Sequence, residues 1–165
     1  MRKKKSFNHV MLVLSFVSSS TMANAGSKEL CQQLETIIAA APTFTSLRGT
    51  PEGSEFDGAL LIETATQCKL RNKSDMDENW RPINDKWDYE CLWDDRAPEA
   101  LAALQGLVKT CLGTQATFGD GSPLGRKYPN YTGGVFQLRG TSVVVDFNKE
   151  TNQLWLSVLP DGVEQ

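Results

Sequence analysis

Apolar residues recur at helical spacing in two stretches of the chain. Residues 29–41 carry them on one face, with Ser27 placed ahead of them to cap the first turn. Residues 98–112 carry a second apolar stripe, and Gly113 follows it as a residue typical of helix ends. The pattern therefore predicts two amphipathic helices, one early in the chain and one past its middle.

Alternation of apolar and polar residues predicts the strands. It is cleanest in residues 87–93, where Cys91 lies on the aromatic face and Asp88 and Glu90 lie on the other. Residues 113–134 are rich in Gly, Pro, Ser, Thr and Tyr and predict a long irregular connection. The predicted strands are residues 60–70, 87–93, 135–138, 141–147 and 153–159. This order, α-β-β-α-β-β-β, predicts an α+β domain with one antiparallel sheet of about five strands and two helices on one face.

Four cysteines lie within these elements, an even number that favours two disulfides in a small exported domain. Four cysteines allow three pairings, so the local structure must choose between them. Strands 60–70 and 87–93 each present one cysteine to the core side, which favours a Cys68–Cys91 bridge. Cys31–Cys111 would then link the two helices.

The N-terminus has the pattern of a secretory leader. Met1–Lys5 is basic, Val10–Val17 is apolar and Ala23–Ala25 has the small residues of a cleavage site. The apolar run is too short for a permanent membrane anchor, and nothing later approaches about twenty apolar residues. We expect residues 1–25 to be a cleaved signal peptide and residues 26–165 to form a single exported domain, periplasmic or secreted, with no stable membrane insertion.

Removal of this leader changes the chemistry that the chain can perform. It lowers the number of basic residues from 17 to 13 against 20 acidic ones, a net charge of −7, and it takes away His9, the only histidine. A chain without a basic stripe is a poor candidate for nucleic-acid binding. Without histidine it cannot build a Ser-His-Asp or Cys-His nucleophile, and the cysteine spacing forms neither a redox motif nor a zinc knuckle. We therefore expect a non-catalytic protein with no metal or cofactor.

Acidic residues concentrate in residues 75–95, where eight of them stand against Arg81 and Lys86. This stretch covers the predicted hairpin loop and the strand after it. We interpret it as an acidic, aromatic-bearing hairpin that docks on a basic protein, with long-range attraction followed by anchoring of the tryptophan. The predicted partner-binding residues are Asp75, Asp77, Glu78, Trp80, Asp85, Asp88 and Glu90. Cationic cell-wall-degrading enzymes and toxins are suitable partners for an inhibitor or immunity protein of this kind. The alternative interpretation of the same charge is an ordinary solvated surface.

Other functions stay open. The spacing Asp75-x-Asp77-x-Asn79 matches the start of a calcium-binding EF-hand loop, but Trp80 replaces its glycine and Lys86 its glutamate, so we expect no such site. A structural or small-ligand module, with Trp87, Trp93 and Trp155 lining a cavity, is a second class. A hydrolase that works with carboxylates alone is a third, although neighbouring Asp94 and Asp95 would point to opposite faces of a strand.

Several short motifs resemble those of a group of small, mostly uncharacterised secreted bacterial proteins. The motifs are Phe44-Thr45-Ser46-Leu47-Arg48-Gly49, Cys68-Lys69-Leu70, Tyr89-Glu90-Cys91-Leu92-Trp93 and Cys111-Leu112. That group has a Phe-x-x-Leu-Arg-Gly turn, a Tyr-x-Cys-x-Trp strand and a Cys-Leu helix end. The resemblance covers most of residues 31–112 and implies an exported bacterial domain, while it implies little about activity.

Overall fold

The strands of the computed structural model join in one eight-stranded antiparallel sheet. The structure describes residues 20–74, 78–79 and 86–160, with side chains from Ser27 onward. The helices are α1 (Ser20–Ala40) and α2 (Glu99–Leu112). The strands are β1 (Arg48–Glu52), β2 (Glu55–Gly58), β3 (Gln67–Asn72), β4 (Trp87–Trp93), β5 (Thr117–Asp120), β6 (Tyr131–Leu138), β7 (Thr141–Asn148) and β8 (Gln153–Pro160). Short 3-10 turns η1 (Thr45–Leu47), η2 (Gly113–Gln115) and η3 (Leu124–Arg126) connect them.

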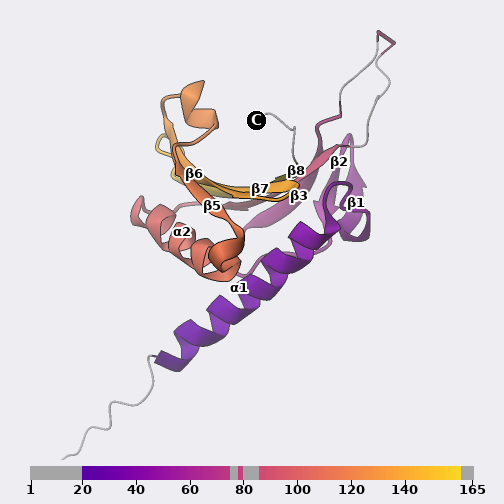
Figure 1. The fold of residues 1–165 in the computed structure, drawn as a ribbon. Helices are drawn as coiled ribbons and strands as arrows, with labels where there is room; N and C mark the ends of the chain where they lie inside the picture. The colour runs from indigo at the N-terminus through magenta and orange to yellow at the C-terminus, as the bar shows by residue number, and fades with distance from the viewer. Residues whose placement is uncertain (1–19, 75–77, 80–85, 161–165) are drawn as a thin grey trace, which may run out of the picture.

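The order of strands across the sheet is β1-β2-β3-β4-β8-β7-β6-β5. The chain thus builds two successive units, each a helix followed by four antiparallel strands, and the last strands of the two units pair at the centre. Both helices lie against the same face of the curved sheet and contact one another (Figure 1). Among the described residues, neither helix lies on the opposite face, and the turn η3 reaches over it from β5–β6 (Figure 1).

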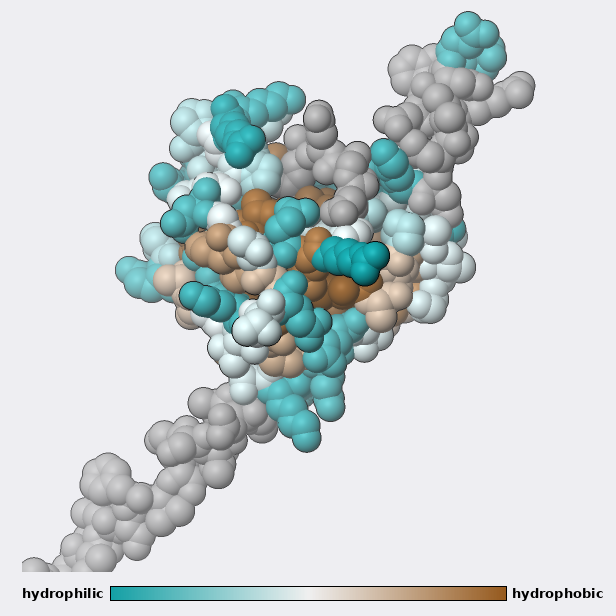
Figure 2. Space-filling model, in the orientation of Figure 1, coloured by the Kyte–Doolittle hydropathy of each residue, from teal (hydrophilic) through white to brown (hydrophobic). Residues whose placement is uncertain are grey.

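The main core lies between the helices and the sheet. Strand alternation sends Tyr89, Cys91 and Trp93 of β4 to this side, with Val143, Val145, Leu154 and Leu156 of the neighbouring strands. They pack against the apolar stripes of α1 and α2, including Leu34, Ile37, Leu104 and Val108. In Figure 2, which has the orientation of Figure 1, the visible hydrophobic residues gather near the middle of the molecule and hydrophilic residues surround them.

The predicted sheet of about five strands is wrong in size and in order. The α+β class, the single antiparallel sheet and the two helices on one face are confirmed, but the sheet has three more strands, β1, β2 and β5. Strand β5, inside the predicted irregular connection, is exposed at every residue, and β1 is an edge strand that contains Gly49 and Pro51. Edge strands that bury neither face need no apolar alternation, so the sequence pattern does not reveal them.

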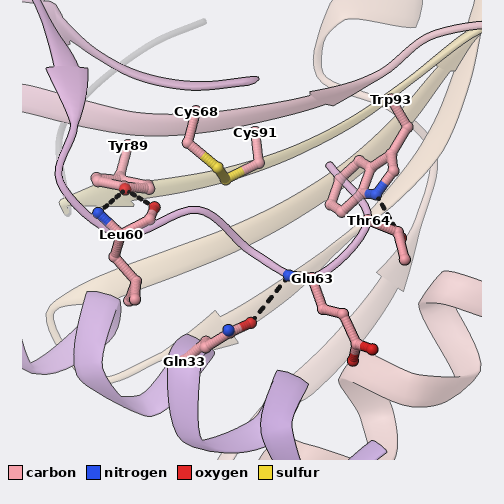
Figure 3. Close-up of a disulfide and its surroundings, with 8 residues drawn as sticks. All are labelled: Gln33, Leu60, Glu63, Thr64, Cys68, Tyr89, Cys91 and Trp93. Carbon is pink, nitrogen blue, oxygen red and sulfur yellow. Dashed lines mark hydrogen bonds between the residues drawn. A yellow bond between two sulfur atoms is a disulfide. The ribbon is translucent and has the colours of Figure 1, made fainter. Parts of the chain in front are cut away.

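The predicted strand 60–70 is also partly wrong, because only its last four residues, 67–70, pair in the sheet as part of β3. Residues 60–66 instead run as a connection between the helices and the sheet, where side chains of β4 and α1 hold them (Figure 3). The Tyr89 hydroxyl donates to the Leu60 carbonyl, the Trp93 indole donates to Thr64 Oγ1 at 3.1 Å, and the Glu63 amide donates to Gln33 Oε1 at 3.0 Å. Backbone groups that a strand would pair are thus partly satisfied by side chains.

Both predicted disulfides are confirmed. Cys68 and Cys91 are direct partners across β3 and β4, so their sulfur atoms bond within the sheet (Figure 3). Cys31 and Cys111 join α1 to α2 across 80 residues of sequence. Helix α1 begins at Ser20, ahead of the predicted cleavage site after Ala25, and the rest of the predicted leader lies outside the described residues. In the described part of the chain neither helix has the length and hydrophobicity that crossing a membrane requires.

The motif Phe44–Gly49 forms the turn that leads from α1 into the sheet. Phe44, in the left-handed region at φ 48°, and Leu47 are buried. The Arg48 guanidinium donates to the Thr43 carbonyl at 3.0 Å and stacks over Trp87 at 4.5 Å. A Cβ on Gly49 would lie 2.7 Å from the Asp57 carbonyl oxygen, so the close approach of β1 to β2 requires glycine.

Candidate functional site

The face of the sheet opposite the helices carries charged side chains where the other face carries apolar ones. The register of β1–β4 and β7–β8 places alternate residues on this side and brings charges from distant parts of the chain together. We define the charged face by Glu52, Glu55, Asp57, Lys69, Arg71, Lys73, Asp88, Glu90 and Asp146. It has six carboxyl groups and three basic groups, so negative charge is in excess.

Ion pairs run across this face from strand to strand. Lys69 Nζ lies 2.8 Å from Glu52 and 3.7 Å from Glu55, and Arg71 Nε lies 3.4 Å from Glu55. Arg71 also pairs with Glu90 on β4, and its Nη1 atom lies 3.0 Å from Glu90 Oε2. Lys73 Nζ lies 3.3 Å from Asp88 Oδ2. All three basic residues of the charged face are therefore engaged by carboxylates.

Asp88 and Glu90 form a coupled carboxyl pair on β4. They are two residues apart on the same side of the strand, and Asp88 is fully buried. Burial raises the pKa of Glu90 to about 7, with the neighbouring Asp88 charge adding to the effect and the positive charges of Arg71 and Lys73 opposing it. Burial also raises the pKa of Asp88, against the charge of Lys73. The pair can share one proton near neutral pH, with Glu90 as the hydrogen-bond donor to Asp88.

A cavity of about 210 Å³ opens at the middle of this face. Six of its residues come from strands β3, β4, β6, β7 and β8, and Lys73 and Leu124 complete the wall. The lining consists of Arg71, Lys73, Glu90, Tyr131, Asp146, Trp155, Ser157 and Leu124. The Arg71 guanidinium lies 5.7 Å from the centre of the Trp155 ring, so the cation that binds Glu90 also covers the indole.

Four buried polar atoms of the residues that line this cavity have no hydrogen-bond partner among the described residues. Arg71 Nε and Glu90 Oε2 lie in ion pairs, so only Asp146 and Trp155 contribute an atom with neither kind of partner. Asp146 is only 2 % exposed, and its Oδ1 atom accepts no hydrogen bond. The buried Nε1 of Trp155, directly across from Asp146 in the β7–β8 pair, has no acceptor. Burial raises the pKa of Asp146 to about 6, and a hydrogen bond from Ser122 lowers it in part. An unpaired buried carboxylate beside an unused indole N–H is costly, and such pairs cluster at functional sites.

Glycine on the next strand makes room for the Asp146 carboxyl group. Gly133 of β6 is the direct partner of Asp146, and a Cβ there would lie 2.1 Å from Asp146 Oδ1 and 2.2 Å from the Val145 carbonyl oxygen. The glycine therefore lets the carboxyl group occupy the surface of β6.

The structure separates the residues that the sequence predicted for partner binding. Glu78 is exposed, and Asp75, Asp77, Trp80 and Asp85 lie outside the described residues. Asp88 and Glu90 belong to the sheet, where they pair with Lys73 and Arg71. Because Asp88 is fully buried, it has no surface with which to contact a partner directly.

Most of the cavity was not predictable from the amino-acid sequence. Trp155 appeared only among three tryptophans of a possible lining, and the other two are buried in the main core. Arg71 and Asp146 were not singled out. Asp146 had one available signal, because it is the only charged residue of the predicted strand 141–147 and follows three consecutive valines.

Two further hollows lack such features. One lies between α1, α2 and the end of β6, and its only charged lining residue is Glu35. The other, around Gly121 and Ser122, is an open surface next to the cavity. In the described part of the chain, no three His, Cys, Asp or Glu side chains are grouped to hold a metal ion.

Comparison with protein-family models, with curated proteins and with solved structures found no match to this chain.

Proposed function

We propose that this protein is an exported, non-catalytic binding module of the bacterial envelope that captures a basic protein. A cell-wall-degrading enzyme or a toxin is the class of partner that fits, and inhibition or neutralisation is the expected consequence. The observation that carries the proposal is the excess of carboxyl groups on the charged face, six against three basic groups. The helices leave this face uncovered (Figure 1).

The arrangement of charge supports capture of a cation more than catalysis. Lys69, Arg71 and Lys73 are held by carboxylates, so they do not repel an approaching basic surface as free cations would. The surplus carboxylates and the exposed Glu78 favour long-range steering of a positively charged protein. Asp88 acts from within the sheet, where it neutralises Lys73, and takes no direct part in contact.

The rigidity of the scaffold suits this role. The Cys68–Cys91 bridge ties β3 to β4 beneath the charged face, and Cys31–Cys111 ties the two helices that support the sheet. A face that is ordered before binding loses less conformational entropy on association.

The test is capture of a purified basic lysozyme by the oxidised domain, measured by calorimetry in low salt and in about 1 M salt, where the screening length falls to about 3 Å. We expect binding that weakens strongly with salt. The triple reversal Glu52→Lys, Asp57→Lys and Glu78→Lys, at exposed carboxylates of the charged face and of the acidic stretch, should abolish it.

The matched control is Glu29→Lys, Glu35→Lys and Glu99→Lys, which changes the net charge equally at exposed positions on the helices. This variant should still bind, because its altered residues lie on the other side of the molecule. Equal loss in both variants would show that only net charge matters, and absence of capture across a panel of basic cell-wall enzymes and toxins would overturn the proposal. Turnover of glycan by the domain alone would replace it with the carboxylate-hydrolase alternative.

A further inference from the structure

The cavity on the charged face contains one carboxylate that no basic side chain of the described residues neutralises. Of the charged residues that line the cavity, Arg71 pairs with Glu90. Lys73 pairs with Asp88, which is fully buried in β4 and does not line the cavity. Asp146 forms no ion pair with any described residue, even though its side chain is almost completely buried, with 2 % exposed. Asp146 is therefore the one carboxyl group of the cavity lining with no cation at ion-pair distance among the described residues, and buried charges are ordinarily paired.

The second unsatisfied group defines what else an occupant needs. Trp155 Nε1 is a buried donor without an acceptor, and Trp155 faces Asp146 across the β7–β8 pair. An occupant that brings a cation to Asp146 and an oxygen to the indole N–H would satisfy both groups. A lysine or arginine side chain brings the cation, and the carbonyl groups of its own polypeptide bring the oxygen.

The size of the cavity favours a side chain over a whole small molecule. Its volume of about 210 Å³ is below the range of about 300–1,000 Å³ common for small-molecule sites. The mixed wall, with an aromatic ring, a leucine and a carboxylate, suits a side chain that has an apolar stem and a charged end.

We propose that this cavity is the subsite for one lysine or arginine side chain of a polypeptide partner, with its cation on Asp146 and a carbonyl oxygen on Trp155 Nε1. The inference rests on the proposed function for the identity of the partner. The chemistry of the subsite can be tested without that partner.

The experiment follows the indole N–H signal of Trp155 by NMR in the ¹⁵N-labelled, oxidised protein, with the signal assigned by Trp155→Phe. The probes are N-acetyl-arginine methylamide, N-acetyl-lysine methylamide and the uncharged N-acetyl-norleucine methylamide. We expect a saturable shift with at least one cationic probe and none with the neutral one. Asp146→Asn should weaken binding by about tenfold or more, since it removes one partner of a buried charge pair.

Glu35→Gln is the matched control, because Glu35 is an exposed carboxylate on α1, on the helix side of the sheet and outside the cavity lining. It should bind the probes as the unmodified protein does. The inference is overturned when neither cationic probe shifts the Trp155 signal, or when Asp146→Asn binds them equally well.

Failure of the subsite and failure of the proposed function give different results. A basic lysozyme that the domain captures equally with and without Asp146→Asn would leave the proposed function in place and remove the subsite. Probes that bind through Asp146, in a domain that captures no basic protein, would support the subsite and remove the proposed function.

Discussion

Replacing Asp146 with asparagine is expected to make the fold more stable at neutral pH. Asp146 is buried without a cationic partner, and its pKa is raised from 3.8 to about 6. The native state therefore holds the proton more tightly than the unfolded chain, and folding becomes less favourable once the pH is high enough to ionise the group. At 1.36 kcal/mol per pH unit, the difference between these values corresponds to about 3 kcal/mol at pH 7 and above.

The sign of the pH dependence follows from the same comparison. Below 3.8 Asp146 is protonated in both states and costs nothing, and between 3.8 and about 6 its penalty grows with pH. Asparagine has nearly the same shape, can still accept a hydrogen bond from Ser122 and does not ionise. The stability gained by Asp146→Asn should therefore be absent near pH 4 and reach at most about 3 kcal/mol above pH 7.

Urea denaturation followed by tryptophan fluorescence, with the disulfides intact and the pH varied from about 4 to 8, measures this difference. Titration of Glu90 in the same range occurs in both proteins and largely cancels when they are compared. The exposed control Glu35→Gln on α1 should show no such pH-dependent gain. A difference between the Asp146→Asn protein and the unmodified protein that does not change with pH, or a loss of stability at pH 7.5, would refute the description of Asp146 as a buried, unpaired carboxylate.

Three further predictions concern the scaffold. The disulfides close loops of 80 and 23 residues, and the loop-entropy relation predicts that loss of Cys31–Cys111 lowers the free energy of unfolding by about 4.5 kcal/mol and loss of Cys68–Cys91 by about 3.4 kcal/mol. Urea denaturation of the two double Cys→Ala variants tests whether the first loss is the larger. Tyr89→Phe should cost about 1–3 kcal/mol, because it leaves the Leu60 backbone groups without their hydroxyl partner inside the core, and an unchanged denaturation midpoint would contradict this. Gly133→Ala should cost about 1–3 kcal/mol by displacing Asp146, whereas Gly119→Ala, with nothing within 4 Å of the added carbon, should cost far less.

The elements that bury one face were predictable from the sequence. The strand over residues 87–93 is β4, the predicted helix 98–112 is α2 to within one residue, and the last two predicted strands are β7 and β8. Their alternation or helical spacing reflects burial directly, because apolar side chains must leave water on one side only. The same alternation placed Cys68 and Cys91 on the core side, and the disulfide pairing followed.

The first half of the predicted strand 60–70 shows where this reasoning fails. Side chains from α1 and β4 hold this segment by hydrogen bonds, and Ile62 and Ala65 are buried there without strand pairing, while Leu61 is exposed. Alternation over a few residues cannot distinguish these two ways of being buried.

The sequence by itself determined the class of the fold, the two disulfides and the excess of acidic residues. Only the tertiary structure decided that Arg71, Glu90, Asp146 and Trp155 meet at one cavity, because they lie on four strands joined through the β4–β8 pair. Alternation fixes the side of a strand to which a residue points, but pairing between distant strands depends on the packing of the whole sheet. That pairing leaves Asp146 buried without a cation, and the proposed subsite depends on it.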